Sequence, residues 1–328
     1  MICLGIESTA HTFGVGIVTD KGKILADAKS VYRPEAGEGI HPRKAFEHHA
    51  VVANDVVVQA LNEAKIQIKD VNVIAFAKGP GLPNSLVVGA LTARFLSLRY
   101  RKPIIGVNHP VGHVEIGKLT TGAKDPVVLY CSGGNTQIIA FTEGKYRVFG
   151  ETLDIPVGNA FDVLARYIGL EMPGGPKIEE LSLKGKWVEL PYIVKGMDFS
   201  FSGIVTECKK LFNKGATRED ISYSLQESCF AMLTEATERA LAHTNKREVL
   251  VTGGVAANRR LKEMIEEMCV ERGAKANCVE LKYSGDNGTM IAWPGILAYN
   301  AGQIDQINTT QVNKNWRIDE AEVKWMGF

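Results

Sequence analysis

The sequence has few of the features that mark secreted or membrane proteins. Its six cysteines, at positions 3, 131, 208, 229, 269 and 278, form no Cys-x-x-Cys pair, which argues against a disulfide framework or zinc knuckle and for a reducing compartment. No apolar run has the length of a membrane span, and the N-terminus has no basic stretch followed by a cleavage site. We therefore expect a cytoplasmic protein that does not enter a membrane.

The chain also lacks a strong net charge. Its 38 lysines and arginines nearly balance 37 aspartates and glutamates, so the formal net charge is +1. Such a protein has no global attraction to nucleic acid or to an anionic membrane. If it acts on a nucleic acid, a local patch or a partner protein must supply the attraction. With 328 residues, 45% of them hydrophobic and 23% charged, the chain can form two globular domains.

One stretch with a possible binding role covers residues 127–141. Here an apolar run enters a turn, Ser132-Gly133-Gly134-Asn135, and a second apolar run leaves it. Adjacent glycines let the backbone approach a ligand closely, with outward-pointing amides that suit a phosphate or a carboxylate. An ordinary β-hairpin has the same pattern. The turn alone leaves both interpretations open.

The start of the chain repeats this layout. Ser8 corresponds to Ser132 and Thr12 to Thr136, at the same offset. A strand that ends in glycines and leads into a helix also occurs twice, within residues 71–100 and from residue 248 onward. The repeated order predicts two related α/β lobes. Glycine turns that face each other between such lobes are a usual place for a nucleotide.

Periodicity and turn residues predict several individual elements. We expect strands within residues 1–32 and helices at 44–64, 86–100 and 218–244. Asn84 or Ser85 can cap the second of these helices. His48 and His49 lie in the first, and because neighbours on a helix point in different directions, we expect a surface or packing role for both.

The sharpest chemical motif is Asn-His-Pro-Val-Gly-His at residues 108–113. Pro110 suits a first helical turn, so His109 and His113 face the same way at a spacing that chelates a divalent metal. Packing and capping are the alternative roles of such a pair. A metallopeptidase is disfavoured, because Pro110 occupies the place of the glutamate in His-Glu-x-x-His. Asp286, in a later Asn-Gly turn that is common without any function, is a candidate oxygen ligand.

Other polar residues lie next to glycine loops. Asp162 and Glu179 are candidate acceptors for ribose hydroxyls, although each alone is more commonly an exposed or capping carboxylate. Asn258 begins the helix after Gly253-Gly254, where a side chain can reach a base or a sugar.

Together the motifs resemble the universal tRNA threonylcarbamoyladenosine-forming family. The chain is similar to its archaeal and eukaryotic branch, the catalytic subunit of the KEOPS complex, which older work called O-sialoglycoprotein endopeptidase. The matching segments follow the family order over nearly the full chain, at residues 5–12, 79–82, 108–115, 130–136, 173–177, 195–203, 253–258 and 286–292.

The resemblance implies a fold and a division into domains. The fold is α/β, an actin-like ATPase fold whose two lobes are duplicated RNase H-like units with a nucleotide cleft between them. We expect the N-terminal lobe at residues 1–124, with residues 300–328 packing back on it. The C-terminal lobe is expected at residues 125–299.

The resemblance also implies a set of site residues. One divalent metal ion, iron ahead of zinc, would be held by His109, His113, Tyr130 and Asp286. Phosphate or carbonyl oxygens of the substrate would lie against the turn formed by Tyr130, Cys131, Ser132, Gly133 and Gly134. The adenosine part of an ATP- or AMP-containing substrate would contact Asp162, Gly175, Glu179 and Asn258.

The implied reaction moves a threonylcarbamoyl group from threonylcarbamoyl-adenylate to N6 of the adenosine next to the tRNA anticodon. A metal would polarise the acyl carbonyl, and the glycine-turn amides would stabilise the oxyanion or phosphate. No general base is evident, and Glu7, His11 and His41 are the candidates. The implied partners are tRNA and KEOPS subunits, including a small protein kinase. Two alternatives stay open, an actin-like small-molecule kinase and a nucleotide-gated scaffold without chemistry.

Overall fold

The structure is a computed structural model that describes residues 1–34 and 39–327. The chain divides into two compact units. Unit 1 comprises Met1–Thr120, Thr142–Tyr146 and Asp286–Phe328, and unit 2 comprises Thr121–Phe141 and Arg147–Gly285. Each unit is built on a five-stranded mixed sheet.

Unit 1 holds the first sheet, with strand order β3-β2-β1-β4-β5. β1 pairs antiparallel with β2 and parallel with β4, and β4 pairs parallel with β5. The elements are β1 (Ile2–Glu7), β2 (Thr12–Thr19), β3 (Ile24–Val31), α1 (Pro42–Ala64), β4 (Val73–Gly79), α2 (Pro83–Tyr100), β5 (Ile104–Asn108), α3 (His109–Thr121) and α10 (Thr289–Asn300).

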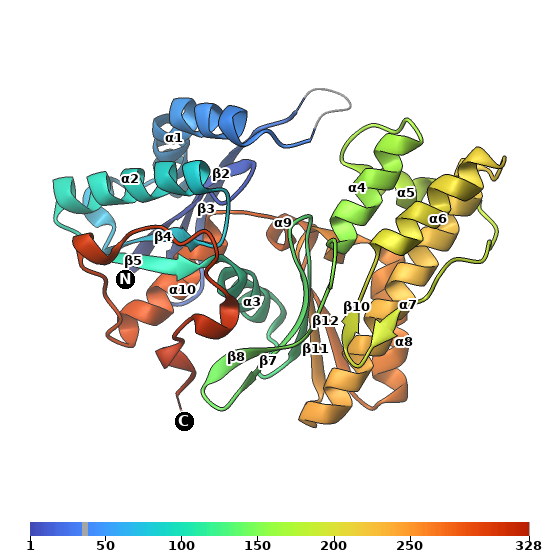
Figure 1. Ribbon diagram of the computed structural model, residues 1–328. Helices are drawn as coiled ribbons and strands as arrows, with labels where there is room; N and C mark the ends of the chain where they lie inside the picture. Colours follow the sequence, from blue (N-terminus) through green and yellow to red (C-terminus); the bar gives the residue numbers. More distant parts are fainter. Residues whose placement is uncertain (35–38, 328) are drawn as a thin grey trace. The chain divides into compact units, whose positions relative to one another are not determined.

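The two faces of this sheet carry side chains of different size. One face contributes large apolar residues to a core shared with α1 and α2, among them Leu4 and Ile6. The other face carries Gly5 and Gly16, where an added Cβ would lie 2.2 Å from a backbone nitrogen of α10. The glycines therefore let the α10 backbone lie directly on the sheet, opposite α1 and α2 (Figure 1).

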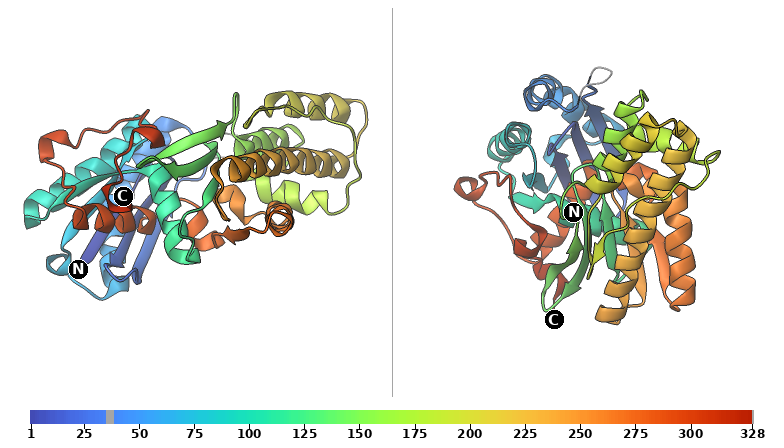
Figure 2. Two further views of the ribbon diagram at one scale, coloured as in Figure 1. Left: turned by 90° about the horizontal axis from the view of Figure 1, so that it is seen from below. Right: turned by 45° about the vertical axis from the view of Figure 1, so that its right-hand side comes forward.

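Unit 2 repeats this architecture, with strand order β12-β11-β6-β7-β8. β6 pairs antiparallel with β7 and parallel with β11, as β1 does with β2 and β4. Helices α7 and α8 pack side by side against this sheet (Figure 2). The elements are β6 (Val127–Cys131), β7 (Thr136–Thr142), β8 (Lys145–Glu151), α4 (Val157–Tyr167), α5 (Gly174–Ser182), β9 (Val194–Lys195), β10 (Asp198–Phe199), α6 (Ser202–Asn213), α7 (Arg218–Thr244), β11 (Glu248–Thr252), α8 (Arg259–Glu271), β12 (Lys275–Cys278) and α9 (Leu281–Ser284).

The duplication predicted from sequence is confirmed strand by strand. Thr12 is the first residue of β2, and its counterpart Thr136 is the first residue of β7. Ser8 and Ser132 lie in the turns that follow β1 and β6. Among the described helices, none is both long enough and apolar enough to cross a lipid bilayer.

Two details differ from the sequence-based expectations. Helix α2 begins at Pro83 with Leu82 at the N-cap and no side-chain cap, so the capping role for Asn84 or Ser85 is wrong. Proline sets the first helical turn by itself, because its fixed φ suits that position and the amide it lacks has no partner there. The unit boundary also differs, because Asp286–Phe328 belongs to unit 1 and not, as expected for residues 286–299, to the second lobe. Its helix α10 packs on β1, β2 and β4.

The neighbouring histidines of α1 pack together. His49 is fully buried, with its ring edge-on to Phe13. Its Nδ1 lies 3.1 Å from Nδ1 of His48, which is only partly buried. Burial lowers the pKa of His49 to about 4, so the ring is neutral in the folded protein at neutral pH.

Candidate functional site

A cluster of ionisable residues lies in unit 1 at the carboxyl ends of β1 and β5. Helix α3 starts directly after β5, with His109 as its first residue. The Oδ1 atom of Asn108 accepts a hydrogen bond from the Val111 amide at 3.2 Å, which closes the first helical turn. His113 then lies one turn beyond His109, on the same face of α3.

Gly112, between the two histidines, sets how closely α3 approaches α10. A Cβ at this position would lie 2.7 Å from the Met290 carbonyl oxygen and 3.3 Å from the Ile291 side chain. Any larger residue would separate the two helices. The glycine therefore allows Asp286, just before α10, to lie beside the histidines of α3.

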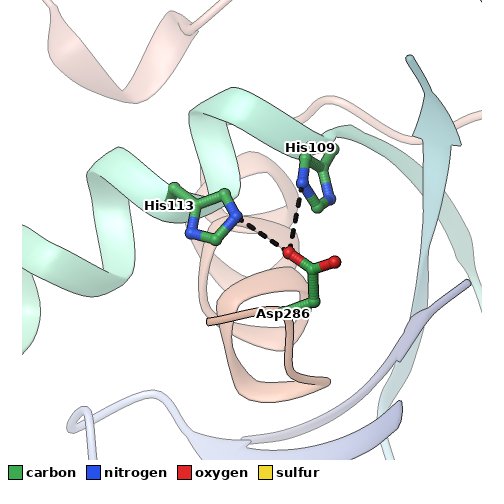
Figure 3. A group of neighbouring side chains, drawn as sticks. All are labelled: His109, His113 and Asp286. Atoms are coloured by element: carbon green, nitrogen blue, oxygen red, sulfur yellow. Dashed lines mark hydrogen bonds and ion pairs between the residues drawn. The ribbon is translucent and has the colours of Figure 1, made fainter. Parts of the chain in front are cut away.

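The structure brings three of the predicted metal ligands together (Figure 3). Oδ1 of Asp286 lies 3.3 Å from Nε2 of His113 and 3.6 Å from Nε2 of His109. Potential ligand atoms of the three residues all lie within 4.8 Å of one another, and no other group of this kind occurs in the described part of the chain. The histidines are buried, while the Asp286 side chain is 17% exposed. Two imidazoles and a carboxylate at this spacing suit a divalent transition metal.

Glu7, at the end of β1, contacts the far side of this cluster. Its Oε2 atom lies 2.9 Å from Nδ1 of His109, so Nε2 is the ring nitrogen that faces Asp286. Its Oε1 atom accepts a hydrogen bond from the Thr9 amide at 2.6 Å. Because the carboxylate is fully buried and engaged, the structure argues against Glu7 as a general base.

The charges of the cluster shift its pKa values. Burial works to lower the pKa of His109, but the charge and hydrogen bond of Glu7 and the charge of Asp286 raise it to about 9. Burial lowers the pKa of His113 despite its contact with Asp286. Burial opposes ionisation of Asp286, but the two histidines hold the pKa of Asp286 well below its usual range. In the metal-free protein, a proton on His109 therefore balances buried carboxylates, and a metal cation would replace that proton.

The remaining predicted metal ligand, Tyr130, belongs to unit 2. It is the penultimate residue of β6 and is 1% exposed. Its role as a ligand stays a prediction.

The glycine turn after β6 closes on itself. The Ser132 hydroxyl accepts hydrogen bonds from the amides of Gly134 at 3.2 Å and Asn135 at 2.9 Å. The expectation that the turn's amides point outward is therefore wrong for these two, because a serine side chain competes for them locally. Among the described residues, no heavy atom lies within 4 Å of a Cβ added at Gly133 or Gly134. The turn is thus open to close approach of a ligand to its backbone.

Direct contacts link this turn to α4, and α4 in turn to α5. Gly158, in the first turn of α4, lies so close that an added Cβ would be 3.0 Å from the Gly133 Cα. Asp162, one turn further along α4, accepts a hydrogen bond from the Gly174 amide at 2.8 Å. A Cβ at the next residue, Gly175, would find no described heavy atom within 4 Å. Asp162 therefore fixes the start of α5, whose glycine is open.

Glu179 and Asn258 each accept hydrogen bonds from backbone amides at the start of α8. Oε1 of Glu179 accepts a hydrogen bond from the Arg259 amide at 2.9 Å. Asn258 is the N-cap of α8, and its Oδ1 accepts hydrogen bonds from the next helical amides. Its Nδ2 donates to Gln226 at 2.9 Å, so the side chain is engaged on both sides. The predicted nucleotide-binding residues of unit 2 are thus connected to one another through α4, α5 and the start of α8. Cys131, at the end of β6, is buried.

Comparison with known proteins identifies the family. The model of the tRNA N6-adenosine threonylcarbamoyltransferase family matches residues 23–293. The chain belongs to this family. A threonylcarbamoyltransferase of that name from Thermococcus sibiricus is 55% identical over 327 residues, which are 99% of this chain and 100% of the relative. A probable bifunctional tRNA threonylcarbamoyladenosine biosynthesis protein from Methanothermobacter thermautotrophicus is 52% identical over 99% of this chain, which spans 61% of that relative's length.

Solved structures agree on the fold. Full-length HypF, in a phosphate- and nucleotide-bound form, matches with a TM-score of 0.61 and 13% identity over 91% of this chain and 46% of that one. An activator of 2-hydroxyisocaproyl-CoA dehydratase from Clostridium difficile matches with a TM-score of 0.55 and 10% identity, over 92% of this chain and 97% of that one. At such low identity the likeness concerns the fold alone, and it confirms the predicted actin-like ATPase fold.

Membership of the threonylcarbamoyltransferase family confirms the recognition made from sequence. The protein is a transferase of tRNA threonylcarbamoyladenosine synthesis, as its relatives are. The family assignment decides against the small-molecule kinase and the scaffold without chemistry.

Proposed function

We propose that this threonylcarbamoyltransferase takes its acyl group from threonylcarbamoyl-adenylate and places it on N6 of the adenosine next to the tRNA anticodon, assisted by a metal ion at His109, His113 and Asp286. Family membership supports the reaction. The convergence of the three side chains within 4.8 Å carries the metal proposal. The glycine loops, whose backbone a ligand can approach closely, support binding of the adenylate.

We propose iron ahead of zinc as the metal. Two histidines and one carboxylate are the ligand set typical of non-haem iron sites, which keep further positions open. Tyr130 is the proposed fourth ligand, as the family resemblance implies. When bound, the metal would act as a Lewis acid toward an oxygen of the reacting acyl group.

The chain's own residues bind and orient the substrate in this proposal. The turn from Tyr130 to Gly134 receives phosphate or carbonyl oxygens, because a Cβ added at Gly133 or Gly134 would find no heavy atom of the described residues within 4 Å. The adenosine would lie against the connected group of Asp162, Gly175, Glu179 and Asn258. Since the side chain of Asn258 is occupied by its cap and by Gln226, we expect it to shape this surface and not to bind the base directly.

The proposed partners are tRNA and the other KEOPS-type subunits, including a small protein kinase, in the cytoplasm. The formal net charge of +1 supports a tRNA-binding surface shared with other proteins, since this chain alone offers little overall attraction to a polyanion.

Reconstitution tests the proposal. Wild-type protein is incubated with threonylcarbamoyl-adenylate, tRNA and partner subunits, and threonylcarbamoyladenosine is measured by mass spectrometry of digested tRNA. The variants His109→Ala, His113→Ala, Asp286→Asn and Tyr130→Phe are compared with His243→Ala, a control at an exposed histidine of α7.

We expect the control to keep full activity, while the histidine and aspartate variants lose both bound metal and product. Metal content per chain is measured by elemental analysis of each variant. Full product formation by metal-stripped protein would refute the metal proposal. Phosphorylation of a sugar without tRNA modification would refute the transfer reaction.

A further inference from the structure

Glu7 is an acidic residue in a fully buried position. It ends β1 and is 0% exposed. A buried carboxylate is tolerated only when its oxygens are paired and hydrogen-bonded. Oε1 accepts hydrogen bonds from both the amide and the hydroxyl of Thr9, and Oε2 accepts one from Nδ1 of His109 at 2.9 Å. Within the described part of the chain, the partners of this carboxylate therefore lie in the turn after β1 or in the metal cluster.

Thr9 is itself held from the opposite side. Its carbonyl oxygen accepts a hydrogen bond from the Leu82 amide at 2.7 Å. A Cβ at Gly81 would lie 2.6 Å from the same oxygen, so the segment before α2 packs directly on this turn. The Thr9 hydroxyl also lies 3.2 Å from Nδ1 of His109. Thr9 thus joins Glu7 and His109 to a part of the chain that has no metal ligand.

We propose that Glu7 and Thr9 form a clamp that fixes His109 with its hydrogen on Nδ1 and keeps Nε2 as the metal-binding atom. This inference rests on the proposed metal site. A neutral imidazole carries one N–H, and a carboxylate 2.9 Å from Nδ1 places it there. When a metal replaces the proton on Nε2, the lone pair of that nitrogen would be available to it on the side of Asp286, whose Oδ1 lies 3.6 Å away. A carboxylate in this place also makes the imidazole a stronger ligand.

The second repeat of the chain supports a role beyond the fold. At the offset that relates Ser8 to Ser132, the counterparts of Glu7 and Thr9 are Cys131 and Gly133. The same strand and turn therefore form without either side chain. The clamp occurs only in the repeat unit that carries the histidine pair, as expected if it serves the metal ligand. Glu7 and Thr9 act through His109 and are positioning residues.

Cobalt binding to metal-stripped protein tests the clamp. Glu7→Gln keeps the side-chain size but removes the charge. Thr9→Val removes the hydroxyl while keeping the backbone amide, and Thr9→Ser is its matched control because it keeps the hydroxyl. For each protein, the Co²⁺ dissociation constant is measured by competition with a chelator, the visible cobalt spectrum is recorded, and thermal unfolding of the metal-free form is followed.

We expect Glu7→Gln to weaken Co²⁺ binding by roughly 10- to 100-fold and to change the visible spectrum. Thr9→Val should weaken binding by about fivefold, as expected for one lost hydrogen bond, and Thr9→Ser by less than about twofold. If Glu7→Gln does not fold, the difference between Thr9→Val and Thr9→Ser decides, and equal affinities of that pair would overturn the clamp.

The remaining outcomes distinguish a failure of the clamp proposal from a failure of the metal-site proposal on which it rests. Unchanged affinity and spectrum in Glu7→Gln, with normal binding by the wild type, would overturn the clamp alone. Weaker binding with an unaltered spectrum would overturn it in favour of a purely structural role for Glu7. A wild type that takes up no Co²⁺, or a His113→Ala variant that binds it normally, would overturn the proposed metal site and the clamp together.

Discussion

Replacing Gly112 by alanine should disturb the metal cluster without touching a ligand. The new Cβ would lie 2.7 Å from the Met290 carbonyl oxygen, whereas ordinary contacts begin at 3.4 Å. Relief of this overlap moves α10 away from α3 by about 0.7 Å. Asp286 precedes α10 and His113 follows Gly112, so their separation of 3.3 Å must widen with it.

The size of the effect follows from two opposing terms. Overpacking a tight contact costs about 1–3 kcal/mol, while replacing a helical glycine by alanine stabilises by about 1 kcal/mol. We therefore expect a net loss of about 1 kcal/mol in the free energy of unfolding. Metal sites tolerate about 0.2 Å in ligand distance, so the shift should weaken metal binding roughly tenfold or more.

Denaturant unfolding of the metal-free protein and metal titration with a competing chelator measure the two effects. Gly203→Ala is a matched control in α6, because the nearest described atom to its Cβ would belong to the Ile193 side chain, at 4.0 Å. The control should be neutral or slightly stabilising, with normal metal affinity. If Gly112→Ala gains stability as the control does and binds metal as tightly as the wild type, the role given to this helix contact is refuted.

Three further predictions concern buried ionisable side chains. Because Glu7 and Asp286 hold the pKa of His109 near 9, metal binding at pH 7.5 should release at least one proton, and metal affinity should rise with pH until about pH 9. Calorimetry in buffers of different ionisation enthalpy measures the proton release, and a binding heat that does not depend on the buffer would contradict the prediction. Because the pKa of His49 falls from 6.5 to about 4 on folding, the free energy of unfolding should be constant above pH 6.5 with respect to this group and decline by about 3 kcal/mol as the pH falls to 4. In denaturant unfolding, His49→Gln should show a shallower decline, and an equally steep decline in that variant would contradict the prediction. The buried carboxylate of Glu115 accepts hydrogen bonds from Tyr146 at 2.6 Å and Trp325 at 3.2 Å. Glu115→Ala should therefore lower the free energy of unfolding by about 3 kcal/mol and expose the segment around Trp325 to limited proteolysis. Cleavage of the variant at the wild-type rate would contradict this role of Glu115.

Much of the fold was predictable because it is written twice in the chain. The matched serine and threonine positions mark equivalent turns and strand starts, and the structure places them so. The return of α10 to unit 1 was not predicted, because it depends on a complementary surface. Its signal was the alternation of Gly5 and Gly16 with large residues on β1 and β2, which leaves one face of the sheet flat enough for a helix backbone.

The site was predictable where it depends on local geometry. A spacing of four residues, with Pro110 in the first helical turn between them, places His109 and His113 on one helical face whatever lies around them. The contact between Glu7 and His109 joins strand ends that are far apart in sequence, so no local pattern could reveal it. Likewise, the amides bound by Ser132 depend on a choice between a ligand and the turn's own side chain.

Unit 1 is discontinuous, and this has a consequence for how the protein matures. The segment that carries Asp286 is translated only after the whole of unit 2 has been synthesised. A nascent chain still on the ribosome at that stage presents two imidazoles without their carboxylate. Loading with metal should thus be a late event, and unit 2 has the opportunity to fold before its partner is complete.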